Sequence, residues 1–220
     1  QEPFGNAVHA ASKVNLRAKT VAIFGLGPIG MFLTLIAKSM GAAMIIGVDP
    51  NPASAEMAIK LGIDHIIILN HISRAAKGDI KHHAHDVEVI DKIMRMTNGM
   101  GVDVSFEMAG FNSSVNNCLY ATRRGGDVVL FGIKNGDIVL EDYNRIIVSG
   151  LTLHCVIGRQ IWQTWKTVRT LLEDANNGIQ EPMFNTILHR GIDTIIPIAE
   201  YSNKVFETKM AAYPKILIKF

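Results

Sequence analysis

The run GLGPIG places Gly25, Gly27 and Gly30 at the spacing of a loop that can bind the pyrophosphate of a dinucleotide. Gly25 permits a tight turn, Gly27 has no side chain to hold a phosphate away, and Gly30 lets the following helix approach the preceding strand closely. Pro28 suits the first turn of that helix, where its missing N–H would have no intrahelical partner. Backbone N–H groups and the helix dipole would then face the phosphates. The alternative is an ordinary tight turn between a strand and a helix.

Asp49 lies 19 residues after Gly30, at the end of the next apolar run. A carboxylate at this position can accept both hydrogen bonds from the diol of an adenosine ribose and would repel a 2′-phosphate. The next residues, Pro50, Asn51 and Pro52, include no arginine to bind such a phosphate. The pattern therefore favours NAD over NADP, against the alternative of an ordinary surface aspartate.

Histidines and cysteines are the residues that could bind a metal. The run KHHAHD holds His82, His83 and His85. Imidazoles suit zinc, copper and nickel, but this polar stretch interrupts the alternation of strands and helices, so we expect a solvated loop. Cys118 and Cys155 lie 37 residues apart, in no metal or redox spacing. We therefore expect no metal site in this chain, and the cysteine usage suits a reducing cytoplasm.

Other polar and aromatic residues allow a functional and a structural interpretation. His9 is expected to pack rather than to catalyse. Glu107 ends an apolar run, where it would either line a ligand crevice or belong to the core. Arg159 precedes a helix and would either bind a carboxylate or phosphate or be an ordinary surface charge. Trp162 and Trp165 share one face of that helix, where packing is the expected role and substrate contact the alternative.

The composition suits a globular protein and narrows its partners. The 220 residues are 48% hydrophobic, which is enough for a full core. The 22 basic residues are interspersed with 20 acidic ones, which gives no reason to expect nucleic acid or an anionic membrane as a partner. No apolar run reaches the roughly 18 residues that span a bilayer.

Apolar runs that read as strands alternate with helical patterns along the chain. The expected strands cover residues 20–25, 43–49, 65–69, 102–110, 126–133, 151–158 and the tail 215–220, and the expected helices cover 28–41, 52–62, 87–99, 113–123 and 160–176. Continuous apolar strands that alternate with helices indicate a parallel sheet covered on both faces. The expected fold class is therefore α/β, a Rossmann-type doubly wound sheet whose ligand crevice lies at the carboxyl ends of the strands.

With these elements in order, the chain resembles the zinc-dependent medium-chain dehydrogenases, and within them the threonine dehydrogenases, over essentially its whole length. The resemblance rests on the segments EPFGNAVHAA, GLGPIG, FEMAG, FGI and GRQIWQTW. It implies a catalytic domain with zinc and a proton relay before a linking segment at residues 1–13. Residues 14–158 would form the NAD-binding domain and residues 159–220 a carboxyl-terminal return segment. Zinc is expected only in such a longer protein, because a catalytic zinc needs about three protein ligands.

The same resemblance implies which residues bind NAD or assist catalysis. Glu2 stands where the family has an acid close to the catalytic zinc, so it is the one catalytic residue expected here. Ser54 and Ile157 depart from the pattern, which has an arginine and a tyrosine at these positions. Ile29 would lie against the cofactor, and the residues after the fifth strand would lie beside the nicotinamide. The expected NAD contacts are Gly25, Gly27, Pro28, Ile29, Gly30, Asp49, Phe131, Gly132, Ile133, Val156 and Ile157.

The expected function is the NAD-binding part of a zinc-dependent alcohol dehydrogenase that acts on a small-molecule alcohol, L-threonine in the branch resembled. This part alone is expected to be inactive. One alternative is a polyol or sorbitol dehydrogenase of the same family, and another is a stand-alone NAD-binding module. A homo-oligomer is expected through an edge strand in which Ile138 and Leu140 alternate with Asp137 and Glu141. The competing expectation is that the tail strand covers that edge.

Overall fold

The computed structural model describes residues 2–69, 83–134 and 136–220. Its centre is a six-stranded sheet in the order β3-β2-β1-β4-β5-β6, in which every pairing is parallel. The chain begins the sheet in the middle and builds outward in both directions, which confirms the expected doubly wound fold. The strand order reverses between β1 and β4, and folds of this kind bind ligands at the carboxyl ends of the strands at that point. The strands are β1 (Thr20–Phe24), β2 (Met44–Asp49), β3 (His65–Ile68), β4 (Val102–Glu107), β5 (Thr122–Leu130) and β6 (Thr152–Cys155).

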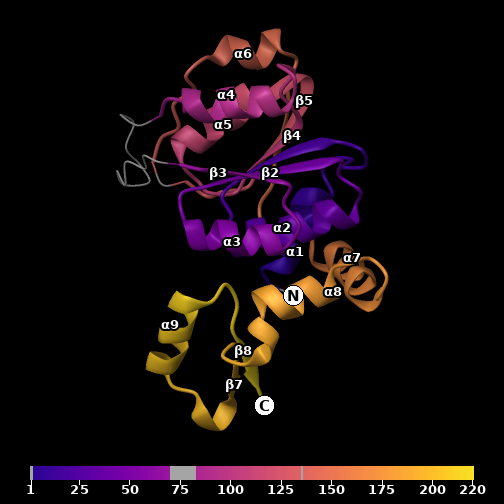
Figure 1. Ribbon diagram of the computed structural model, residues 1–220, viewed down its shortest axis with the longest axis vertical. Helices are drawn as coiled ribbons and strands as arrows, with labels where there is room; N and C mark the ends of the chain where they lie inside the picture. The colour runs from indigo at the N-terminus through magenta and orange to yellow at the C-terminus, as the bar shows by residue number, and fades with distance from the viewer. Residues whose placement is uncertain (1, 70–82, 135) are drawn as a thin grey trace.

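Helices cover both faces of this sheet (Figure 1). On one face lie α1 (Phe4–Ala11), α2 (Pro28–Ser39) and α3 (Pro52–Lys60), and on the other lie α4 (Val87–Met96) and α5 (Asn112–Ala121). Alternate residues of one strand enter opposite cores: Ile23 packs with the first set of helices and Phe24 with the second. Strands buried on both faces must be apolar throughout, which is why their sequences read as continuous apolar runs.

The helix ends follow from local sequence. Asn51 caps α3 by accepting a hydrogen bond from Ala53 N at 3.0 Å, and Pro52 occupies the first turn. Asp86 caps α4 through Val89 N at 3.1 Å. These caps fix the residue at which each helix begins, so they also place the loops that join the strands to these helices.

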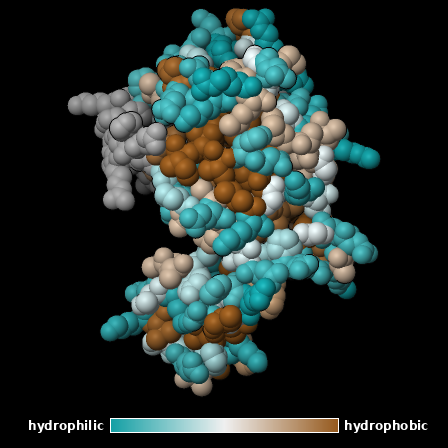
Figure 2. All heavy atoms as spheres, in the orientation of Figure 1, coloured by the Kyte–Doolittle hydropathy of each residue, from teal (hydrophilic) through white to brown (hydrophobic). Residues whose placement is uncertain are grey.

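The carboxyl-terminal part continues from α7 (Ile161–Glu173) into short elements: α8 (Gln180–Pro182), η2 (Met183–Ile187), η3 (His189–Gly191), β7 (Ile195–Pro197), η4 (Ile198–Glu200), α9 (Asn203–Ala212) and β8 (Leu217–Lys219). β7 and β8 form a separate two-stranded parallel sheet. Figure 2 shows apolar side chains at the surface of this part, where Ile192 and Phe220 are strongly exposed. The domain boundaries after residues 13 and 158 stay a prediction.

The expected edge strand around Ile138 and Leu140 is wrong. This segment is irregular and leads into α6 (Tyr143–Val148). Its backbone pairs with asparagine side chains of α5 instead of with a strand: Val139 N donates to Asn112 Oδ1 at 3.2 Å, and Asn116 Nδ2 donates to Val139 O at 2.9 Å. The edge of the sheet on this side is β6, and the tail strand β8 pairs with β7 rather than covering that edge.

No helix in the described part of the chain is both long and apolar enough to cross a membrane.

Candidate cofactor site

The glycine loop joins β1 to α2 at the carboxyl edge of the sheet. Gly25 has a φ of +102°, which L side chains rarely adopt. A Cβ at Gly30 would lie only 2.1 Å from the carbonyl oxygen of Gly25, whereas a Cβ at Gly27 would meet nothing within 4 Å. Two glycines are thus required by the fold, and the third leaves open space before the amino end of α2. Gly27 is the N-cap and offers no side chain to the first-turn N–H groups, which suits a phosphate ligand.

Asp49 is buried at the end of β2 and fixes the glycine loop. Its Oδ2 accepts a hydrogen bond from Leu26 N at 2.6 Å, and its Oδ1 accepts one from Asn51 N at 2.8 Å. The sequence interpretation considered a ligand role or an ordinary surface aspartate for Asp49, and it did not predict this bond to the loop. Each carboxylate oxygen can accept a further hydrogen bond, so the same residue can also receive a ribose hydroxyl. Ser54, at the position where the family has an arginine, lies half-buried on α3.

The opposite wall of the crevice comes from the segments after β5 and β6. Phe131 N and Gly132 N donate to the main-chain oxygen of Glu107 at 3.0 and 3.1 Å. The Ile133 and Ile157 side chains are 75% and 81% exposed, so they are free to contact a ligand.

Val156, an expected cofactor contact, continues the pairing of β6 by donating from its N–H to Leu130 O at 3.0 Å. Its side chain is only 7% exposed and packs in the hydrophobic core, so a contact with the cofactor would have to come from its main chain. The role of Val156 stays a prediction.

Glu2 lies at the junction of α1 with the start of α7. Its carboxylate forms an ion pair with Arg159 and accepts a hydrogen bond from Asn6 Nδ2 at 2.5 Å. His9 is buried, and its Nδ1 is 3.0 Å from Gly158 O. Arg159 therefore binds a carboxylate of its own chain, and His9 packs as expected. The catalytic role of Glu2 stays a prediction.

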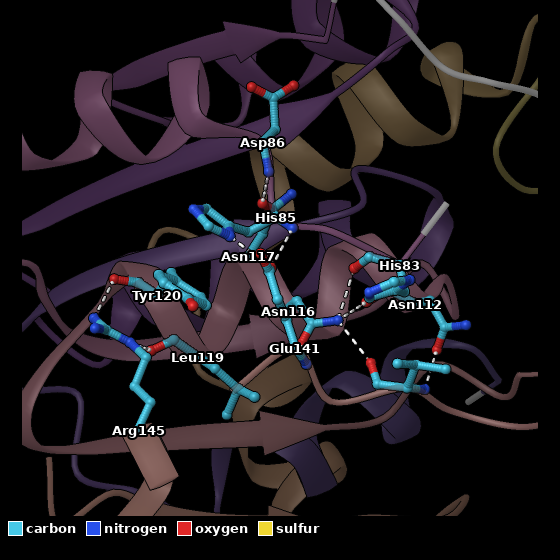
Figure 3. A network of polar contacts seen from close by, with 11 residues as sticks. His83, His85, Asp86, Asn112, Asn116, Asn117, Leu119, Tyr120, Glu141 and Arg145 are labelled. Atoms are coloured by element: carbon cyan, nitrogen blue, oxygen red, sulfur yellow. Dashed lines mark hydrogen bonds and ion pairs between the residues drawn. The ribbon is translucent and has the colours of Figure 1, made fainter. Parts of the chain in front are cut away.

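The histidine run contributes to a polar network on the α5 side of the sheet (Figure 3). His85 is not the solvated loop residue that its sequence suggested. Its Nδ1 is 2.6 Å from Glu141 Oε2, and its ring stacks on Tyr120 with centroids 3.7 Å apart. Burial acts to raise the pKa of the Glu141 carboxyl, but hydrogen bonds from the His85 backbone N–H and ring hold that pKa below its ordinary value. Arg145 lies 4.4 Å from the centroid of the same tyrosine ring.

In the described part of the chain, no group of three or more His, Cys, Asp or Glu side chains could hold a metal ion. Cys118 is buried in the core on α5, whereas Cys155 is exposed at the end of β6. His82 lies outside the described residues. The residues that the structure describes do not fit a catalytic zinc.

Trp162 and Trp165 contact each other edge to face, with ring centroids 5.5 Å apart. They line an open groove on α7 together with Arg169 and Leu172. Trp162 is 75% exposed and Trp165 Nε1 is buried without a hydrogen-bond partner. The pair is thus only partly packed, because one of its two tryptophans is largely exposed.

A glycine loop after the central strand and an acid at the end of the neighbouring strand together define a Rossmann-type domain. Residues 28–174 match the family model described as zinc-binding dehydrogenase, and the chain belongs to this family.

The chain is similar over most of its length to curated dehydrogenases. It is 32% identical to an L-threonine 3-dehydrogenase of Pyrococcus horikoshii over 88% of this chain and 51% of that protein. It is also 32% identical to an L-threonine 3-dehydrogenase of Symbiobacterium thermophilum, over 86% of this chain and 49% of that protein. The chain therefore spans about half the length of the curated relatives it matches.

Solved structures of related dehydrogenases share the fold. L-idonate 5-dehydrogenase of Escherichia coli superposes with a TM-score of 0.72 at 26% identity, covering 100% of this chain and 55% of that one. For 2R,3R-butanediol dehydrogenase of Bacillus subtilis the TM-score is 0.70 at 22% identity, over 99% of this chain and 55% of that one, and this likeness concerns the fold alone.

Proposed function

We propose that this chain is the NAD(H)-binding part of a zinc-dependent alcohol dehydrogenase that oxidises L-threonine at its C3 carbinol to 2-amino-3-oxobutanoate. The observation that carries the cofactor part is the open face of Gly27 at the amino end of α2, with Asp49 bonded to the same loop. The similarity to L-threonine 3-dehydrogenases supports the substrate part.

In this proposal each residue of the crevice has a defined task. The N–H groups at the start of α2 bind the pyrophosphate, with Ile29 against the cofactor, and Asp49 accepts the hydroxyls of the adenosine ribose. Phe131, Gly132 and Ile133 form the wall beside the nicotinamide, and the exposed Ile157 is a further contact. When bound, NAD supplies the hydride acceptor. None of these tasks involves zinc, because the described residues do not fit the metal.

The test of the cofactor assignment is a fluorescence titration of the chain with NADH and with NADPH. We expect NADH to bind at least tenfold more tightly, about 1.4 kcal/mol, because the Asp49 carboxylate would repel a 2′-phosphate. Asp49→Asn should reduce this preference. Asp64→Asn is the matched control, since Asp64 also accepts a backbone hydrogen bond, from Ile45 N at 2.7 Å, without lying on the glycine loop. Equal affinities of the unmodified chain for the two cofactors would refute the role of Asp49.

A polyol dehydrogenase is the second candidate function, favoured by the 26% identity and shared fold with L-idonate 5-dehydrogenase. The two candidates differ only in substrate. An assay of L-threonine, L-idonate and sorbitol separates the two candidates. It uses the protein encoded by the longest open reading frame that contains this chain. Cofactor binding without turnover of any alcohol by that longer protein would instead favour a stand-alone NAD-binding module.

We further propose that two copies of the chain associate through β6. In the described part of the sheet, β6 pairs with β5 and has no strand on its other side. Val156 N donates to Leu130 O of β5. Because successive N–H groups of a strand point to opposite sides, those of Leu153 and Cys155 point to the open side. An edge of this kind is able to pair with its own copy about a two-fold axis.

A further inference from the structure

Glu107 is a buried carboxylate at the point where the order of the strands reverses. It ends β4 and pairs in register with Phe24, the last residue of β1. Its exposed fraction is 1%. Burying a charge costs free energy unless hydrogen bonds satisfy it. The hydrogen bonds of the Glu107 side chain therefore indicate its role.

The side chain of Glu107 binds the loop that follows it. Its Oε1 accepts hydrogen bonds from Ala109 N at 3.0 Å and from Gly110 N at 2.8 Å, and the Ser114 hydroxyl donates to the same oxygen. These donors fold residues 108–111 into a tight turn, in which Gly110 has a φ of +74°. The turn leads directly into α5, whose third residue is Ser114.

The main chain of Glu107 binds the segment after β5. Its carbonyl oxygen accepts from Phe131 N and Gly132 N. A Cβ at Gly132 would lie 2.4 Å from Glu107 Oε2, and a Cβ at Gly110 would lie 2.5 Å from Ile133 O. The turn at 108–111 and the segment 131–133 are thus pressed together, with Glu107 bonded to both.

The same turn also touches the glycine loop. Met108 N donates to Phe24 O at 2.9 Å. A Cβ at Gly25 would lie 3.0 Å from Ala109 Cβ. The turn therefore lies between the loop that faces the phosphates and the segment that forms the opposite wall, and a change in its shape would move one relative to the other.

We propose that Glu107 is a positioning residue that fixes the wall formed by residues 131–133 for the nicotinamide end of the cofactor. The inference rests on the proposed NAD(H) site and adds to it a residue that does not touch the ligand. It predicts that the nicotinamide half of the cofactor depends on Glu107 while the adenine half, bound by Gly27 and Asp49, does not.

Titrations with NADH and with ADP-ribose test this separation, because ADP-ribose has the adenine and pyrophosphate but no nicotinamide. We expect Glu107→Met to weaken NADH binding at least tenfold and to change ADP-ribose binding by less than twofold, since it removes the oxygen that accepts from Ala109 N, Gly110 N and the Ser114 hydroxyl. The fluorescence enhancement of bound NADH should fall at saturation. Ser114→Ala, which removes a single donor, should give a smaller loss of the same kind, and Glu56→Met on the exposed surface of α3 should give none.

The outcomes separate the two proposals. An unmodified chain that binds neither probe refutes the proposed NAD(H) site. An unmodified chain that binds both equally well, or a Glu107→Met variant that keeps its NADH affinity or loses both probes to the same extent, overturns the positioning role alone. If Glu107→Met does not fold, the Ser114→Ala comparison decides the question by the same criteria.

Discussion

Two substitutions in the glycine loop each add one methyl group, but they should affect different properties, stability in one case and ligand binding in the other. In Gly30→Ala the new Cβ would lie 2.1 Å from the Gly25 carbonyl oxygen, and in Gly27→Ala it would meet nothing within 4 Å. The backbone of Gly27, with φ −65° and ψ −175°, is one that alanine adopts freely. We therefore expect Gly30→Ala to damage the fold and Gly27→Ala to damage only ligand binding.

The contact distance sets the size of the first effect. Non-bonded carbon and oxygen atoms need about 3 Å or more, so the start of α2 must move away from β1 by about 1 Å. Overpacking of this kind typically costs about 1–3 kcal/mol. For a chain of this length each kcal/mol lowers Tm by roughly 2–4 °C, so Gly30→Ala should lose roughly 2–12 °C. The Tm of Gly27→Ala should rise by roughly 1–4 °C, because a Gly→Ala change in a compatible conformation stabilises by about 0.4–1 kcal/mol.

Thermal unfolding and NADH titration of both variants test this reasoning. Gly27→Ala should bind NADH at least tenfold more weakly, about 1.4 kcal/mol, because its methyl group occupies the space in front of the first-turn N–H groups. An unchanged NADH affinity in Gly27→Ala would show that the phosphates do not lie there. An unchanged Tm in Gly30→Ala would show that the strand and helix are not in the close contact described.

Three further predictions concern pH, association and turnover. Burial acts to raise the pKa of Asp103, but hydrogen bonds from Thr20 and Arg123 hold that pKa below its ordinary value. The Asp103 carboxylate therefore stabilises the folded state above the unfolded pKa of about 3.9. This stabilisation is lost as the pH falls through the lower pKa of the folded state. Asp103→Asn should lower the urea midpoint at pH 7 and flatten its fall below about pH 4, and parallel curves for the two proteins would contradict this. Leu153→Pro removes an N–H on the open side of β6 and should convert a dimer to a monomer in sedimentation, at unchanged Tm. A monomeric unmodified chain, or a variant that still dimerises, would rule out β6 as the interface. The chain alone should not reduce NAD with L-threonine, with or without added zinc, and turnover abolished by a chelator would reveal a metal site that we have not identified.

The sequence predicted the sheet well because its signals are local. The strands at the centre of the sheet, such as β1 and β2, are continuous apolar runs. The glycine spacing needs only its own strand and helix to be recognised. The polar first half of β5, from Thr122 to Gly125, was not predicted as strand. Asp49 was also found by spacing alone. Its hydrogen bond to Leu26 N was not predicted, because a carboxylate at the end of a strand gives no local sign of which loop it will contact.

The wrong predictions depend on contacts between residues far apart in the chain. Ile138 and Leu140 have the alternation of a strand, but the backbone between them bonds to Asn112 and Asn116, more than 20 residues earlier. His85 lies in a polar run and would be solvated if Glu141, 56 residues later, did not bind it. β7 was not predicted, because three residues are too few to show a periodicity, whereas the strand predicted in the tail at residues 215–220 is present as β8.

The burial of α1 has a consequence for the order in which the chain folds as it is synthesised. All eight residues of α1 are buried, against α2 and against α7, and His9 on α1 bonds to Gly158 O across 149 residues. α1 therefore acquires α7 as a neighbour only after the whole Rossmann sheet has been synthesised. Until then its apolar face is accessible to solvent and to chaperones. Translation pauses before α7 should prolong this state, whereas pauses after α7 should have little effect on the yield of folded protein.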